Sequence, residues 1–275
     1  ESTSETTQLK MVERKLVDIF SKNDVTFINS YYKAYPSKIQ RPAIPLLVGS
    51  LPENEHVSIA ESSLIMEYLM EEMELKTGSK SSLEPSSAFA KSQVGIFVHA
   101  VNREIFPCIN SILNSSNLER LEKAVDRLME ALGCIETMLK RSQMEIDDSS
   151  TNKYFLGSNF SLAEAKAAPC FQRLLLVVPK LRPELASVKS LRPFGGKDTT
   201  ILFEMVKTRF PATAKWLSAV LERPSVQTNF HAQDITEVLS RARVNKFDMP
   251  ALNEDQVFTN TKSKMEGLLL SRKVQ

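Results

Sequence analysis

Apolar residues in the middle of the chain recur at intervals of three and four, which restricts this stretch to helices. From 94 to 112 the intervals are 4, 3, 4, 3 and 4 (Val94, Val98, Val101, Ile105, Cys108, Ile112). From 118 to 139 the same spacing returns (Leu118, Leu121, Val125, Leu128, Leu132, Ile135, Leu139). Each run places one apolar stripe along a long helix. The short polar break at 114–117 predicts that the two helices pack antiparallel.

Further helix signals follow. Ser161 and Glu164 have the spacing of a capping box, in which hydroxyl and carboxylate each satisfy a backbone amide. Pro169 lies inside that helix, and Pro211 opens another that carries Trp216. The segment 140–153 is expected to be an exposed loop, and a short helix with a polar tail is expected beyond residue 232.

The first 75 residues carry a different pattern, which mixes helix and strand. The sequence predicts, in order, a helix from Leu9, strands over 25–32, 44–50 and 57–60, and a helix over 61–73. Ser62 is the expected N-cap of the last helix, with Ile65, Leu69 and Met73 on one face. The stretch 76–87 is typical of a linker.

Composition excludes several classes of function. The chain of 275 residues has 35 Lys+Arg against 33 Asp+Glu and no sustained basic run, which argues against nucleic acid or a membrane surface as main partner. Its 8 glycines form no phosphate-binding loop. The 3 cysteines have no CxxC spacing and the 3 histidines are dispersed, so no metal site is expected. The cysteine pattern and the lack of a signal-peptide core favour a cytoplasmic location.

Four motifs occur in an order that resembles the cytosolic glutathione transferase family. They are Ile44-Pro45 before a strand, Glu61-Ser62 at a strand-to-helix junction, NFSLAEAKAAP, and KWLSAVLERPSV. The resemblance covers residues from about 9 to 230, and VNREIFPCI (101–109) is similar to omega-type and related fungal members. It implies a thioredoxin-like glutathione-binding domain over 1–78, then an all-helical domain over 86–275 with a polar C-terminal extension.

The resemblance also implies a binding site for glutathione as co-substrate. Pro45 is expected to be cis, so that the backbone of Ile44 pairs with the cysteinyl part of the tripeptide. Glu61 would meet its α-amino group, and Ser62 with the helix amides would receive the γ-glutamyl carboxylate. Lys33 and Arg41 are equally well explained as glycyl-carboxylate contacts and as solvated charges. Taken singly, Ile-Pro is also an ordinary strand start and Ser62 an ordinary helix cap.

The sequence departs from the family where the glutathione thiol is activated, so the catalytic residue is unknown. The place of the omega-type cysteine falls at Leu9, which cannot donate a hydrogen bond or attack. No apolar run precedes the first helix, and only twelve residues separate Tyr32 from Pro45, too few for a full second helix with its loops. The N-terminal domain is therefore expected to be incomplete: either these elements lie outside the given sequence, or this member lacks the catalytic edge.

Two functions are consistent with this pattern. The first is a homodimeric glutathione transferase of detoxification, which conjugates glutathione to a hydrophobic small molecule or performs glutathione-dependent thiol transfer. Phe97, Val101 and Phe106 are expected to wall its apolar groove. The alternative is a non-catalytic module for protein-protein assembly, in which the tail from 232 and the loop 140–153 form a partner surface. Cys108 and Cys170 are expected to be buried structural thiols.

Overall fold

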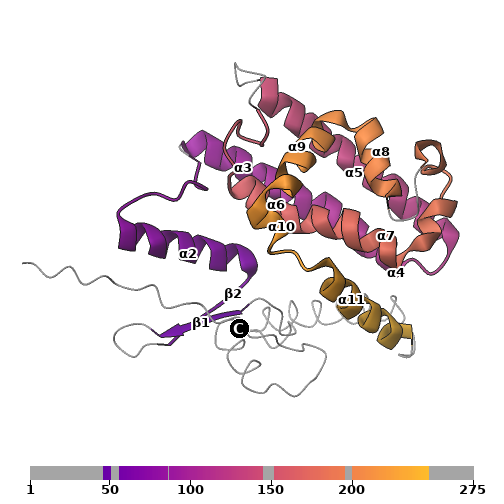
Figure 1. The fold of residues 1–275 in the computed structure, drawn as a ribbon, viewed down its shortest axis with the longest axis horizontal. Helices are drawn as coiled ribbons and strands as arrows, with labels where there is room; N and C mark the ends of the chain where they lie inside the picture. Colours follow the sequence, from indigo (N-terminus) through magenta and orange to yellow (C-terminus); the bar gives the residue numbers. More distant parts are fainter. Residues whose placement is uncertain (1–45, 51–55, 86, 145–151, 196–199, 248–275) are drawn as a thin grey trace, which may run out of the picture. The chain divides into compact units, whose positions relative to one another are not determined.

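The structure, a computed structural model, describes residues 46–50, 56–85, 87–144, 152–195 and 200–247 (Figure 1). The chain divides into two compact units, residues 1–81 and residues 82–275. The predicted helix from Leu9 and the predicted strand over 25–32 lie outside the described residues.

The described part of the first unit is a strand hairpin with one helix. Strands β1 (Leu46–Ser50) and β2 (His56–Ala60) pair antiparallel, with Leu46 opposite Ala60 and Ser50 opposite His56. Helix α2 (Ser62–Thr77) contacts both strands and ends at Gly78, whose φ of 65° suits a left-handed C-cap. The two predicted strands and the helix after them are confirmed.

One expectation for α2 is wrong, and its apolar face is more exposed than that of the helices in the second unit. Its N-cap is Glu61, so Ser62 is the first helical residue instead of the cap. None of its residues is buried, and Leu69 and Met73 are 39% and 51% exposed, so the predicted apolar stripe is only partly covered. The spacing was sufficient to predict a helix, but burial of its stripe depends on the partner surface.

The second unit begins with one long helical rod followed by an antiparallel helix. The rod consists of α3 (Ala88–Ala100), the π-helical turn η1 (Val101–Ile105) and α4 (Phe106–Asn114), and α5 runs from Leu118 to Met144. Both predicted apolar stripes are largely buried between them. Phe97 is fully buried, whereas Val98, the residue of the predicted stripe beside it, is only partly buried. Helix α5 also extends to Met144, into the predicted loop.

The remaining elements complete the helical unit. In order they are α6 (Leu162–Gln172), η2 (Arg173–Val177), α7 (Val178–Leu181), η3 (Pro183–Ser187), η4 (Arg192–Phe194), α8 (Ile201–Arg209), α9 (Pro211–Glu222), α10 (Pro224–Gln227) and α11 (Ala232–Phe247). The helix starts predicted at Ser161 and Pro211 are confirmed. Helix α11 has 16 residues, longer than the short helix expected there.

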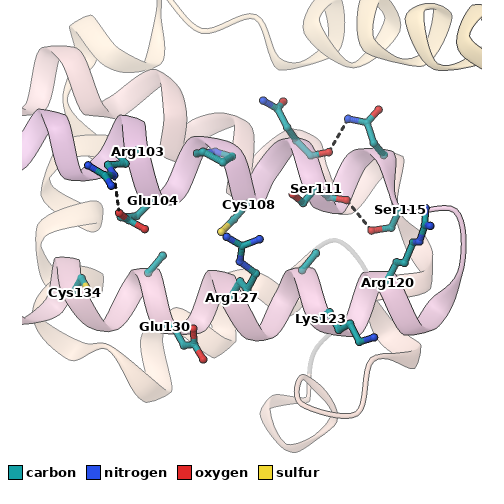
Figure 2. A pocket seen from close by; sticks show the side chains of 15 residues that line it. Arg103, Glu104, Cys108, Ser111, Ser115, Arg120, Lys123, Arg127, Glu130 and Cys134 are labelled. Atoms are coloured by element: carbon teal, nitrogen blue, oxygen red, sulfur yellow. Dashed lines mark hydrogen bonds and ion pairs between the residues drawn. The ribbon is translucent and has the colours of Figure 1, made fainter. Parts of the chain in front are cut away.

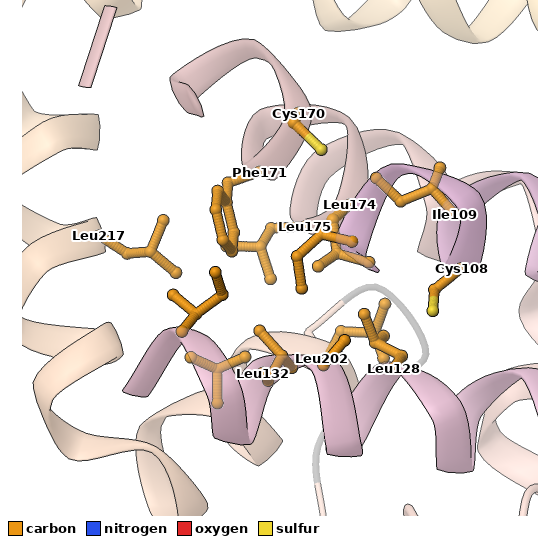
Figure 3. Packing of buried hydrophobic residues seen from close by; sticks show 14 of the residues in the cluster. Cys108, Ile109, Leu128, Leu132, Cys170, Phe171, Leu174, Leu175, Leu202 and Leu217 are labelled. Atoms are coloured by element: carbon orange, nitrogen blue, oxygen red, sulfur yellow. The ribbon is translucent and has the colours of Figure 1, made fainter. Parts of the chain in front are cut away.

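Aromatic rings from four segments meet in the core of this unit. Trp216 of α9 is fully buried and packs edge-to-face on Phe97 and Phe171, at centroid distances of 5.5 and 5.3 Å. Phe97 also stacks on Phe155 at 4.4 Å. Figure 3 shows leucines of α5, η2, α8 and α9 filling the space beside Phe171. This packing carries most of the hydrophobic stabilisation of the unit.

The prediction that Cys108 and Cys170 are buried thiols is confirmed. Cys108 and Cys170 are buried, and Cys134 is exposed. Burial raises the pKa of the Cys170 thiol to about 12 and also raises that of Cys108. Both thiols are therefore protonated and unreactive near neutral pH.

Glu164 is a buried carboxylate that joins three segments. Its Oε1 accepts from the Phe155 amide at 2.7 Å and from Trp216 Nε1 at 2.9 Å. Its Oε2 accepts from the amide and the hydroxyl of Ser161 at 2.9 and 2.8 Å. The predicted capping box thus also anchors the loop before α6 and the tryptophan of α9.

Glu136 of α5 caps another helix from a distance in sequence. It is 6% exposed and accepts from the amides of Ala212 and Thr213, and from the Thr213 hydroxyl, at 2.8–3.1 Å. Lys140 pairs with it at 3.1 Å. Because α9 has no side-chain cap of its own, this carboxylate satisfies its first amides.

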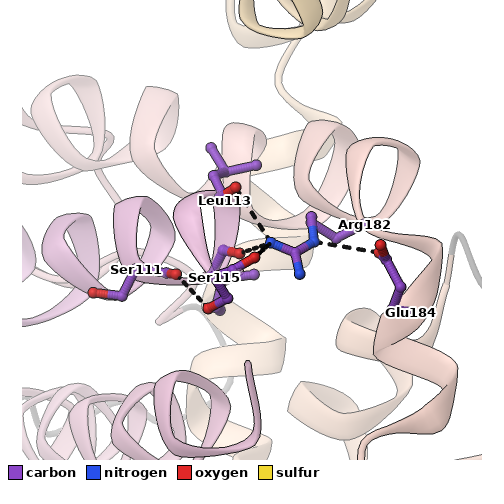
Figure 4. A network of polar contacts seen from close by, with 6 residues as sticks. Ser111, Leu113, Ser115, Arg182 and Glu184 are labelled. Carbon is purple, nitrogen blue, oxygen red and sulfur yellow. Dashed lines mark hydrogen bonds and ion pairs between the residues drawn. The ribbon is translucent and has the colours of Figure 1, made fainter. Parts of the chain in front are cut away.

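Arg182 caps the C-terminus of helix α4. It is 3% exposed, and its Nη1 donates to the carbonyls of Ile112, Leu113 and Ser115 at the C-terminus of α4 (Figure 4). Its Nε donates to Glu184 at 3.3 Å. A cation at this position complements the negative end of the helix dipole and gives the last carbonyls of α4 a charged donor.

Candidate functional site

The most unusual backbone in the described part of the first unit lies between β2 and α2. Glu61 has φ 76° and ψ 117°, and it is the one non-glycine with positive φ among the described residues. Such a conformation costs a residue with a Cβ about 1–3 kcal/mol and tends to persist where it serves a function. Ala60 before it is 5% exposed, whereas Glu61 itself is exposed, so the strained turn presents this residue to solvent.

The start of α2 is suited to hold a carboxylate. No described side chain accepts from its first-turn amides, and that turn contains no acidic residue. The first backbone bond of the helix runs from the Ile65 amide to the Glu61 carbonyl at 3.0 Å, which leaves the preceding amides open. These amides lie at the positive end of the helix dipole, and Ser62 is exposed beside them.

The structure brings some of the predicted site residues together and leaves others undescribed. Glu61 and Ser62 are consecutive at the β2–α2 junction. Ile44 and Pro45 lie outside the described residues, immediately before β1. Since Leu46 is paired with Ala60, the start of β1 and the end of β2 are neighbours in the sheet. The remaining predicted positions, Leu9, Lys33 and Arg41, are also outside the described residues.

The described part of the first unit contains no cysteine or tyrosine suited to activate a thiol. None of the three cysteines belongs to it. Tyr68 on α2 is its one described tyrosine, and burial together with Glu72 raises the pKa of its hydroxyl. A hydroxyl that stabilises a thiolate needs the opposite shift, because it has to donate strongly to an anion. The catalytic residue therefore stays unidentified.

The prediction that three apolar residues line a groove is wrong for two of them. Phe97 and Val101 are both 0% exposed and belong to the core of the helical unit. Phe106 is 38% exposed. Phe97 and Val101 are four residues apart, so one α-helical turn places both on the same interior face, on which the apolar stripe already placed Val101.

Other site classes find no support in the described residues. No cluster of three or more His, Cys, Asp or Glu side chains in the described ranges could hold a metal ion. Among the same residues, no helix combines the length and apolar character that crossing a bilayer requires.

Comparison with solved structures identifies the fold. No protein-family model and no curated protein matches the sequence. The structure is similar to a Tau class glutathione S-transferase from mango, Mangifera indica, with a TM-score of 0.55, 20% identity, and coverage of 83% of this chain and 84% of that one. It is also similar to yeast Ure2p in complex with glutathione, with a TM-score of 0.50 and 19% identity, covering 72% of this chain and 74% of that one.

A third structure is a fragment of the same yeast protein. The nitrogen regulation fragment of the yeast prion protein Ure2p has a TM-score of 0.50 and 17% identity, covering 77% of this chain and 78% of that one. At these identities the likeness concerns the fold. The chain has the glutathione transferase fold, and the prediction of a thioredoxin-like N-terminal part followed by a helical domain is confirmed.

Proposed function

We propose that this protein binds glutathione at the junction of β2 and α2. The observation that carries the proposal is the strained, exposed Glu61 ahead of a helix whose first amides have no side-chain cap. A junction that only connected a strand to a helix would be more stable with glycine at position 61, because glycine adopts a positive φ without strain and is an acceptable N-cap. A ligand that bonds to the open amides and to the Glu61 carboxylate gives a reason for glutamate at this position.

The chemistry of the γ-glutamyl group matches this junction. Its α-carboxylate would accept from the open amides of α2 and from the Ser62 hydroxyl, at the positive end of the dipole. Its α-amino group would meet the Glu61 carboxylate, which the positive φ turns outward. Ile44 and Pro45, which precede β1, would pair in strand fashion with the cysteinyl part.

The reaction that follows from this binding mode is attack by the glutathione thiolate. The sulfur would bond to the electrophilic carbon of a hydrophobic small molecule, and either a leaving group such as chloride departs with the bonding electrons or a carbon–carbon π bond opens. Alternatively, the sulfur would attack one sulfur of a mixed disulfide, break the S–S bond and release the other sulfur as a thiolate. A homodimer and detoxification belong to the same proposal and rest on the family resemblance. The cytoplasmic location, also part of it, rests on the cysteine pattern and the lack of a signal-peptide core. Two thioredoxin-like domains per dimer would give two glutathione sites.

The second candidate is a non-catalytic module for protein assembly. The observation that favours it is the lack of a thiol activator: Leu9 stands at the expected sequence position, and the described residues of the first unit include no cysteine. Support comes from the nitrogen regulation fragment of Ure2p, a regulatory protein whose fold is similar to that of this chain. Glutathione binding is compatible with either candidate, and activity separates them.

Calorimetric titration with glutathione tests the proposal. Ser62→Ala removes one hydrogen bond to a charged group and should weaken binding about tenfold. Ser92→Ala on α3 is the matched control, because Ser92 is also an exposed helical serine but belongs to the other unit. Binding that is insensitive to Ser62→Ala would contradict the placement of the site. If glutathione binds, turnover of a chloro-aromatic acceptor or of a small mixed disulfide then decides between transferase and thiol transferase, and turnover of neither favours the assembly module.

A further inference from the structure

Helices α4 and α5 form the walls of an open groove on the helical unit (Figure 2). The groove has a volume of about 650 Å³ and includes one end of the π-turn η1. Its floor is made of small side chains that are nearly buried: Cys108, Ala124 and Ala131 are 7%, 5% and 6% exposed. Larger polar side chains stand on both sides, so the floor is open to a narrow ligand such as an extended peptide.

One half of the groove is strongly basic. Arg120, Lys123 and Arg127 stand on α5 at intervals of three and four residues, which places them on one helix face. Figure 2 shows the Arg127 guanidinium pointing across the groove toward Cys108. The α4 wall opposite contributes serine and asparagine side chains and no carboxylate (Asn110, Ser111, Asn114, Ser115).

These cations are only partly neutralised by the protein itself. Lys123 pairs with Glu119, four residues before it on α5, at 2.7 Å, and both side chains are exposed. Arg120 has a 3.5 Å contact with the Ser116 hydroxyl, and no ion pair to Arg120 or Arg127 occurs within the described ranges. The carboxylates of the groove are at its other end, where Glu104 pairs with Arg103 at 3.7 Å and Glu130 lies across from them.

We propose that this groove binds an extended acidic segment of a partner protein, a role beyond glutathione binding. Carboxylates of the segment contact Arg120, Lys123 and Arg127, and its backbone lies over the small floor residues. The α5 wall from Arg120 to Cys134 rises about 21 Å, which an extended chain of about six residues spans. The lining contains no large exposed apolar side chain apart from Pro107, so charge rather than apolar burial selects the partner.

The length and charge of the groove also specify where the acidic residues fall. Arg120 to Arg127 covers about 10 Å of helix, which matches about three extended residues. The other end, with Glu104 and Glu130, accepts neutral residues. Because the cations are exposed, binding weakens as salt shortens the Debye length from about 10 Å at 0.1 M to about 3 Å at 1 M.

The test uses the full chain and a fluorescein-labelled peptide of three glutamates followed by three alanines. Fluorescence anisotropy at about 50 mM salt compares the wild type with the groove variant R120S/K123S/R127S. The matched control is K153S/K207S/K215S, whose three lysines are exposed and outside the groove. Each triple variant changes the net charge from +2 to −1, because three positive charges are removed. Circular dichroism verifies that both variants are folded.

The expected result is at least a tenfold weaker affinity in the groove variant and less than a threefold change in the control. Equal weakening in both variants would show that net charge alone attracts the peptide and would overturn the proposal. Absence of wild-type binding would overturn it as well. The proposal would also be overturned if sedimentation velocity showed a dimer for the wild type and a monomer for the groove variant, because the groove would then be occupied by a second copy of this chain. None of these readings uses glutathione, so the outcome is independent of the binding site at α2.

Discussion

Replacing Glu164 by glutamine should cost the helical unit several times what an exposed Glu→Gln change costs. The substitution keeps the size and shape of the side chain and replaces one carboxylate oxygen by an NH₂ group. Glu164 is 0% exposed and accepts four hydrogen bonds, two at each oxygen. All four partners are donors in the present arrangement, so the added donor has no free acceptor unless Ser161 turns its hydroxyl.

The magnitude follows from the four contacts. The glutamine oxygen can keep the Phe155 amide and Trp216 Nε1, at 2.7 and 2.9 Å in the wild type. The NH₂ group then faces the Ser161 amide, and leaving that buried N–H unpaired costs about 1–3 kcal/mol. The bonds that remain lose their charge assistance, which about halves their strength. We expect a total loss of about 3 kcal/mol in the free energy of unfolding.

Equilibrium unfolding in urea, followed by tryptophan fluorescence, measures this loss. Trp216 is the single tryptophan of the chain and bonds directly to Glu164, so its emission reports on this unit. Glu222→Gln on α9 is the control, because that glutamate is exposed, and should change stability by less than about 0.5 kcal/mol. If Glu164→Gln cost no more than Glu222→Gln, the four-donor interpretation of this carboxylate would be refuted.

Three further predictions use the same kind of measurement. Arg182→Met should lower the free energy of unfolding by about 3 kcal/mol, because three carbonyls at the end of α4 lose the bond from the guanidinium. A loss below about 1 kcal/mol in urea unfolding would contradict this. Burial raises the pKa of Glu136. Hydrogen bonds from the Thr213 and Ala212 amides, the Thr213 hydroxyl and Lys140 lower it by more than burial raises it, so the pKa lies below the ordinary 4.5. Its stabilisation is therefore present at neutral pH and lost as pH falls below about 4.5, and Glu136→Gln should flatten the acid limb of a stability-versus-pH curve; an unchanged limb would contradict the assignment. Glu61→Gly should stabilise α2 by about 1 kcal/mol, measured as slower amide hydrogen exchange, because glycine adopts the positive φ without strain. The same substitution should weaken glutathione binding, and faster exchange would argue against strain at this residue.

Local signals in the sequence were enough to predict most of the helical unit. The three- and four-residue intervals of the two long stripes predicted the rod and α5, because burial of one face is what sustains a long helix. Ser161 with Glu164 marked the start of α6, and Pro211 and Pro224 marked the two ends of α9. These residues act within one turn of their own position, which is why a single sequence reveals them.

Features that depend on tertiary contacts could not be predicted. Phe97 and Val98 are neighbours near one face of α3, and packing against other segments decides that Phe97 is the one fully buried. Glu136 and Arg182 look like surface charges in sequence, yet each satisfies a helix end far away in the chain. Their partners are 77 and 67 residues distant, so no local pattern marks them.

The candidate site was predicted only in part. The Glu61-Ser62 pair came from its motif, but the positive φ of Glu61 did not, because glutamate carries no preference for that region. The sequence predicted the N-cap one residue too late, at Ser62, because serine is a better N-cap than glutamate. The strained junction that results is the strongest structural support for a ligand at this position.

The most direct test of the proposed function is the heat of glutathione binding to the wild-type chain, measured beside Ser62→Ala. We predict saturable binding with a dissociation constant of about 1 mM or tighter, weakened about tenfold by Ser62→Ala and unchanged by Ser92→Ala. No detectable binding at millimolar glutathione would contradict the central claim that the β2–α2 junction is a glutathione site.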